Sequence, residues 1–84
     1  MQDRYIVPEV QEMMNRLKKS VDDIMVDLEK AKLFPEKKEE ILEEVEKVTF
    51  VMDILFNDNN LGELEKSFIY VESLRLNIPH WEKP

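Results

Sequence analysis

The residues best suited to chemistry are six glutamates between positions 36 and 46. Their spacings of three and four residues put carboxylates side by side on a helix, and carboxylate oxygens are the ligands that hard divalent cations take. The same spacing also suits a solvated helix surface, on which Glu43 supports Lys47 by about 0.3 kcal/mol. We favour the solvated surface and keep divalent-metal binding as an alternative. The glutamates are Glu36, Glu39, Glu40, Glu43, Glu44 and Glu46.

Other catalytic side chains are few. The sequence has no Cys, and its one His, His80, stands beside Trp81 near the C-terminal end. Without Cys there is neither a thiolate nucleophile nor a thiolate metal site. Ser20, Ser67 and Ser73 fall within expected helices instead of on the strained turn that exposes a nucleophilic serine. We therefore expect no enzymatic activity, no metal site of this kind and no cofactor.

The charge balance bears on the class of partner. Asp and Glu outnumber Lys and Arg by 19 to 12, for a formal net charge of −7. This charge repels phosphate backbones and anionic lipid surfaces, so we expect no nucleic acid and no membrane as partner, although an acidic mimic of DNA remains open. The sequence has no apolar run of signal-peptide or membrane-spanning length, and we expect a cytoplasmic protein.

Prolines and one asparagine-rich run divide the chain. A single Gly in 84 residues leaves few positions for tight turns and favours long helices with short joints. The residue before a proline avoids the helical region, and proline itself suits a first helical turn. We predict one all-α domain, residues 1–84, folded as an antiparallel three-helix bundle of up-down-up order. Its helices are expected at about 8–32, 35–57 and 60–77, followed by a short extended C-terminal tail, 78–84.

Apolar residues at alternating intervals of four and three predict the buried face of each helix. We call the row of apolar residues on each buried face a seam. The expected first seam is Val10, Met14, Leu17, Val21, Ile24, Leu28 and Ala31, and the second is Ile41, Val45, Val48, Met52 and Leu55. The third is Leu61, Leu64, Phe68 and Val71, then Leu74 or Ile78. Asn60, with Glu63 three residues on, is predicted to cap the third helix.

Residues 48–56 are apolar on every side. Their β-branched and aromatic residues are also typical of a buried strand, but the helical register continues through them, so we predict a helix. Phe50 then lies opposite the buried seam, with Val51 and Ile54 beside it. Either the C-terminal tail covers this side, with Ile78 and Trp81 as lids, or a second chain does.

These observations predict a small acidic protein-protein interaction module, acting as a regulator, adaptor or inhibitory partner of another protein. The alternative is a homodimer, in which two copies pair their first and second helices into a larger bundle. The candidate partner-binding residues are Phe50, Val51, Ile54, Phe34 and Trp81.

Residues 62–79 resemble the second helix of a tetratricopeptide repeat. Gly62 stands where that family has a glycine before its helix, Ser67 and Ser73 occupy small-residue positions, and Pro79 closes the segment. The resemblance covers about a fifth of the chain, and repeats of this kind need about three units to bury their faces. It implies a helical hairpin, and no family is recognised over the whole chain.

Overall fold

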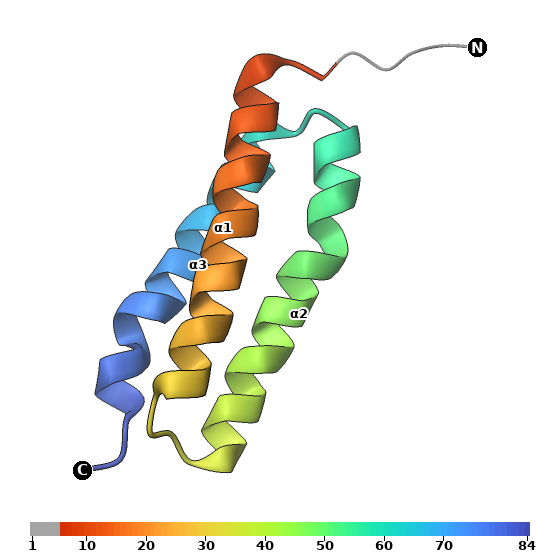
Figure 1. Ribbon diagram of the computed structural model, residues 1–84. Helices are drawn as coiled ribbons and strands as arrows, with labels where there is room; N and C mark the ends of the chain where they lie inside the picture. Colours follow the sequence, from red (N-terminus) through yellow and green to blue (C-terminus); the bar gives the residue numbers. More distant parts are fainter. Residues whose placement is uncertain (1–5) are drawn as a thin grey trace.

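Three helices pack side by side along their lengths (Figure 1). The structure is a computed structural model, and it describes residues 6–84. Helix α1 spans Pro8–Lys30, α2 spans Pro35–Asn57 and α3 spans Leu61–Trp81. At about 1.5 Å per residue these helices are rods of roughly 32–35 Å. The predicted all-α bundle is confirmed, and residues 48–56 are helical, as expected. Among the described residues, no helix combines the length and the apolar character needed to cross a membrane.

Prolines begin the first two helices. Val7 and Phe34, which precede them, are both extended, with ψ of 147° and 144°, as the bulk of the proline ring requires. Helix α3 begins differently: the Asn60 side chain accepts a hydrogen bond from the backbone N–H of Glu63 at 3.2 Å, which confirms the predicted cap. The preceding Asn59 has a φ of 53°, a left-handed conformation that asparagine tolerates well.

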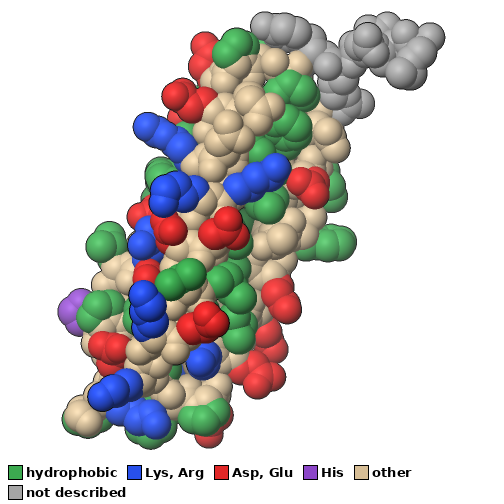
Figure 2. Space-filling model, in the orientation of Figure 1, with side chains coloured by type: hydrophobic (Ala, Val, Ile, Leu, Met, Phe, Trp, Pro, Cys, Tyr) green, Lys and Arg blue, Asp and Glu red, His purple; other side chains and the backbone are tan. Residues whose placement is uncertain are grey.

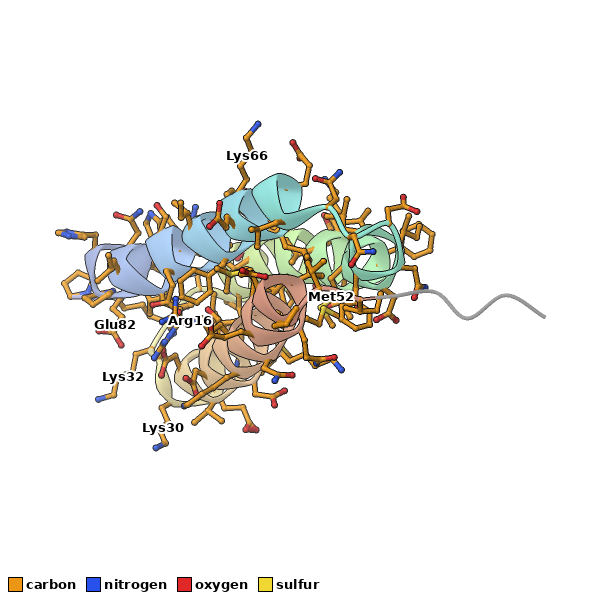
Figure 3. All side chains as sticks on the ribbon, turned by 90° about the horizontal axis from the view of Figure 1, so that it is seen from above. Arg16, Lys30, Lys32, Met52, Lys66 and Glu82 are labelled. Carbon is orange, nitrogen blue, oxygen red and sulfur yellow. The ribbon has the colours of Figure 1, made fainter. Side chains whose placement is uncertain are left out.

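Hydrogen bonds join the ends of the helices. At one end, the backbone N–H of Val7 donates to Oδ1 of Asn59, 3.2 Å away, so the start of α1 lies against the α2–α3 turn. At the other end, the N–H of Lys83 donates to the carbonyl oxygen of Lys32 at 2.7 Å. The N–H of Lys32 donates to Glu82 in return, and Lys32 and Glu82 lie at the same end in Figure 3.

The core follows the predicted seams closely. Figure 3 shows Met52 among the helices and Lys66 pointing away from them. Val21, Ala31, Leu55, Leu61, Phe68 and Leu74 are partly buried against the core. Leu33, in the α1–α2 connection, is buried as well although no seam predicted it. The buried apolar residues are Val10, Met14, Leu17, Ile24, Leu28, Leu33, Ile41, Val45, Val48, Met52, Leu64, Val71 and Ile78.

The predicted end of the third helix is wrong. We expected a stop near residue 77 and an extended tail from 78, but α3 continues through Pro79 to Trp81, and only residues 82–84 lie beyond it. A proline in the last turn removes one backbone hydrogen bond. The burial of Ile78 and the partial burial of Trp81 outweigh that loss, and the Lys83–Lys32 hydrogen bond holds the end in place. The first helix also ends at Lys30, two residues before the expected boundary.

Leu64→Ala should lower the free energy of unfolding by about 2–5 kcal/mol, because Leu64 is fully buried and the substitution leaves a cavity. Leu76→Ala, on the exposed side of the same helix, should change it by no more than about 0.5 kcal/mol. Urea unfolding followed by circular dichroism measures both. Equal losses for the two variants would mean that α3 turns a different face to the core.

Candidate functional site

Three neighbouring apolar side chains on the outer side of α2 form the α2 strip, defined as Phe50, Val51 and Ile54. Their exposed fractions are 78%, 37% and 53%. Phe50 and Ile54 stand one turn apart, so their side chains are neighbours. On the inner side of the same turns, Val48 and Met52 are buried in the core. The α2 strip therefore lies on a helix whose opposite face is packed in the core.

The other two predicted partner-binding residues lie elsewhere. Phe34 caps the start of α2, with the Lys83 ammonium 5.4 Å from its ring centroid. Trp81 ends α3, with the Lys37 ammonium 4.2 Å from its ring centroid. Lys37 precedes Phe50 by 13 residues, which is roughly 20 Å along a helix. The five predicted residues therefore form two separate groups, at opposite ends of α2.

The C-terminal residues do not cover Phe50, so the hypothesis that the tail acts as its lid is wrong. Ile78 faces the core and Trp81 contacts Lys37 in the first turn of α2. The reason is register: because α3 continues helically, its last turn stays beside the beginning of α2. Within residues 6–84, Phe50 is left 78% exposed.

A second apolar surface on α3 was missed from the sequence. The α3 stripe, defined as Ile69, Ser73, Leu76 and His80, follows intervals of four, three and four, so these residues share one helix face. Ile69 and Leu76 are 65% and 75% exposed. Neither charged residues nor buried residues belong to this stripe. The sequence signal was present, but it competed with the seam through Leu64 and Val71.

Polar contacts between α1 and α3 centre on Arg75. Its Nε donates to Asp27 at 3.0 Å and its Nη1 to Glu72 at 3.1 Å, while Asp23 lies 3.6 Å away. The neighbouring carboxylates, Asp27 first, raise the pKa of the Arg75 guanidinium. The Ser20 hydroxyl also donates to Glu72. These contacts fix the register between α1 and α3.

A hollow of about 220 Å³ lies over this network. Arg16, Lys19 and Phe68 complete its lining. Ser20 is 2% exposed. Its hydroxyl donates a hydrogen bond to the Glu72 carboxylate, which also accepts one from Arg75. The hydrogen bond from Ser20 helps to hold α1 against α3.

A second hollow, of about 260 Å³, lies between α2 and α3. The Tyr70 hydroxyl on α3 donates to Glu44 on α2. This hydrogen bond raises the pKa of Tyr70 to about 12, with desolvation and the Glu44 charge acting in the same direction. The pKa of Glu44 is lowered, first by Tyr70 and then by Lys47, whose ammonium lies 3.2 Å from it. The hollow is lined by Lys37, Glu40, Ile41, Glu44, Tyr70, Leu74 and Trp81.

The structure also bears on the metal alternative. Within the described part of the chain, no three acidic or histidine side chains are grouped so as to hold a metal ion. The glutamates of α2 share one side of the helix but differ in their contacts. Glu44 accepts from Tyr70 and Glu40 pairs with Lys37 at 2.8 Å, whereas Glu39, Glu43 and Glu46 are exposed and form no ion pair among residues 6–84.

Comparison with protein families, with curated proteins and with solved structures finds no match for this chain. The tetratricopeptide-like segment therefore gains no support beyond its helical conformation.

In a Tyr5→Phe background, which leaves one tyrosine, the absorbance of Tyr70 near 295 nm should titrate with a pKa of about 12. The folded state retains the proton that the unfolded state loses near pH 10, so this contribution to stability is complete below pH 10 and is lost as the pH rises toward 12. Glu44→Gln should shift the Tyr70 pKa down toward 10. A midpoint near 10 in the presence of Glu44 would contradict the hydrogen bond.

Proposed function

We propose that this chain is a protein-protein interaction module without enzymatic activity, which acts as a regulator, adaptor or inhibitory partner by binding another protein through the α2 strip. The observation that carries the proposal is the exposure of Phe50, Val51 and Ile54 side by side on one helix. Single exposed apolar side chains are ordinary, whereas apolar patches of a few hundred Å² are typical of interaction sites.

Burial of the α2 strip supplies a driving force of useful size. Fully burying one large apolar side chain contributes about 1.5–3 kcal/mol. Aromatic residues are also enriched among those that dominate the energy of an interface. Phe50, the most exposed of the three side chains, is the proposed anchor, and Ile54 and Val51 complete the apolar contact.

Anchoring of the strip lowers the cost of binding. Helix α2 carries Val45, Val48 and Met52 on its inner side, buried against the other helices. The backbone beneath the strip is therefore ordered before a partner arrives, which reduces the entropy lost on association.

The proposal takes the bundle to have up-down-up order. Two pairs of contacts support that order: Val7 with Asn59 at one end of the molecule, and Lys83 with Lys32 at the other. Each pair joins a helix end to the turn between the other two helices. The α2 strip then lies beside the α2–α3 turn, away from the Lys83 end.

A photoreactive phenylalanine analogue at position 50 tests the proposal in the native cell. We expect one discrete covalent adduct, identified by mass spectrometry, because the anchor enters the partner. The matched control places the same analogue at position 26, where Val26 is about half exposed on α1, and should give no such adduct. Ile54→Lys should abolish the adduct at position 50 while leaving the helical content unchanged.

The adduct counts in favour only if the identified partner, once purified, binds the wild-type chain saturably and binds Ile54→Lys roughly tenfold more weakly. Equal affinity for both chains, or equal adducts at positions 50 and 26, would contradict the assignment of the interface to the α2 strip.

A second candidate function is a homodimeric helical bundle without a separate partner. The observation that favours it is the α3 stripe, which exposes Ile69 and Leu76 on one helix face and contains no charged residue itself. Two chains of charge −7 repel each other least where acidic groups are absent. The stripe supports pairing through α3 and not through the first two helices, since the large exposed apolar side chains of α1 are Met25 and Val26 alone.

Light scattering from a sizing column over a tenfold concentration range tests this candidate. A dimer would double the single-chain mass of 10.1 kDa at the higher concentrations, and Leu76→Glu should restore the single mass by adding a charge to each side of the contact. Phe50→Glu is the matched control on α2 and should leave the dimer intact. A single-chain mass throughout would exclude the homodimer over that range.

A further inference from the structure

Carboxylates frame the α2 strip along its own helix face. We define the acidic ladder as Glu39, Glu43, Glu46 and Asp53, which with Phe50 follow intervals of four, three, four and three. These intervals place all five side chains on one outward face of α2. Figure 2 shows acidic side chains following one another along the outer margin of α2, at the lower right of the view. Phe50 therefore projects from a row of negative charges.

The acidic ladder is not neutralised by the molecule itself. Among residues 6–84, none of its four carboxylates forms an ion pair, whereas Glu40 and Glu44 on the same helix are paired with Lys37 and Lys47. Lys47 is the lysine nearest the strip in sequence, and Glu44 already holds it at 3.2 Å. The ladder thus presents uncompensated negative charge beside an exposed aromatic ring.

The framing is a local feature and does not follow from the net charge alone. The four residues of the α3 stripe include no carboxylate. Of its acidic neighbours, Glu72 is paired with Arg75, whereas Glu65, four residues before Ile69, forms no ion pair among residues 6–84. Both apolar surfaces therefore have acidic neighbours, but more of those along the α2 strip are unpaired, and the two surfaces suit partners of different charge.

We propose that the segment bound by the α2 strip is a basic amphipathic helix of another protein, with an apolar row that receives Phe50 and Ile54 and with Lys or Arg on both flanks. This inference rests on the proposed function and adds the chemistry of the partner. The flanking cations would meet the acidic ladder, which gives complementary charge, and the apolar row would cover the strip.

Two other occupants fit the surface less well. A second copy would set acidic ladder against acidic ladder, with Lys47 as the nearest compensating charge. An extended peptide that binds by strand addition needs a sheet edge, and the described residues contain no strand. A helix that packs along α2 needs neither a sheet edge nor like charges in contact.

The test uses a fluorescently labelled model peptide of about 18 residues, in which Leu and Lys alternate at the helical period, and a counterpart with Glu in place of Lys. Fluorescence anisotropy measures binding to the full chain. We expect saturable binding of the Leu/Lys peptide that weakens as salt is added, and binding of the Leu/Glu peptide weaker by roughly tenfold or more.

Variants with matched controls test whether this binding occurs at the α2 strip and the acidic ladder. Phe50→Ser removes the anchor, and its matched control Ile69→Ser removes an exposed apolar side chain on α3. Glu43→Gln with Glu46→Gln removes two charges of the ladder, and its matched control Asp22→Asn with Glu29→Gln removes two exposed charges of α1. Each α2 variant should weaken binding by roughly tenfold, and each control by less than about threefold.

Equal weakening by the α2 variants and their controls would overturn the inference, because the peptide would then respond only to net charge. Equal binding of the Leu/Glu peptide, or no saturable binding, would overturn it as well. The cross-link at position 50 separates this failure from that of the proposed function. An adduct on an acidic or uncharged segment of another protein overturns the basic partner and leaves the interaction module standing, whereas absence of any adduct overturns the module itself.

Discussion

The structure depends on the burial of one narrow apolar face of α1 against α3. Leu17, Ile24 and Val10 on α1 and Leu64 and Val71 on α3 are fully buried, and removing apolar area from water is the dominant favourable term in folding. Polar contacts of Arg75 and Ser20 then select one register of the two helices, since a shift by one turn would leave partly buried charges without partners. Helix α2 completes the core against this pair, and its outer side is left to solvent.

Most of the fold could be predicted from short-range sequence features, because helix ends and buried faces depend on neighbouring residues. Pro8 and Pro35 begin helices, Asn60 caps the third helix, and the spacing of apolar residues gave nearly all of the core. The end of α3 was predicted wrongly because tertiary packing outweighed the local preference of proline. Pro79 disfavours a helix in isolation, but the burial of Ile78 and the contact of Trp81 with Lys37 stabilise one more turn.

The candidate site was predicted less completely, for a geometric reason. The exposed position of Phe50 follows from the spacing within α2, and it was anticipated. The separation of Phe34 from Phe50 follows from the length of α2, but the place of Trp81 depends on how α3 lies relative to α2, which local spacing does not specify. The α3 stripe shows the same limit: α3 is apolar on two faces, and only its contact with α1 decides that Leu64 turns inward and Leu76 outward. The Arg75 network joins positions 48 residues apart and has no local pattern at all.

The size of the bundle bears on the proposal that charge selects the partner of the α2 strip. A chain of 84 residues buries a smaller share of its surface than a larger domain does, so apolar groups on the outside of α2 and α3 are expected on size alone. Apolar area by itself would attract any apolar partner, and selectivity comes from what a wrong partner leaves unpaired or repelled. On α2 the acidic ladder penalises acidic and hydrophobic-only partners, because its carboxylates would lose water without gaining a cation. Beside the α3 stripe this effect is smaller, because Glu72 is already paired with Arg75. In the proposed interaction, the two faces would therefore differ more in the partners they exclude than in their apolar area, and Glu43, Glu46 and Asp53 would make the α2 strip the more selective surface.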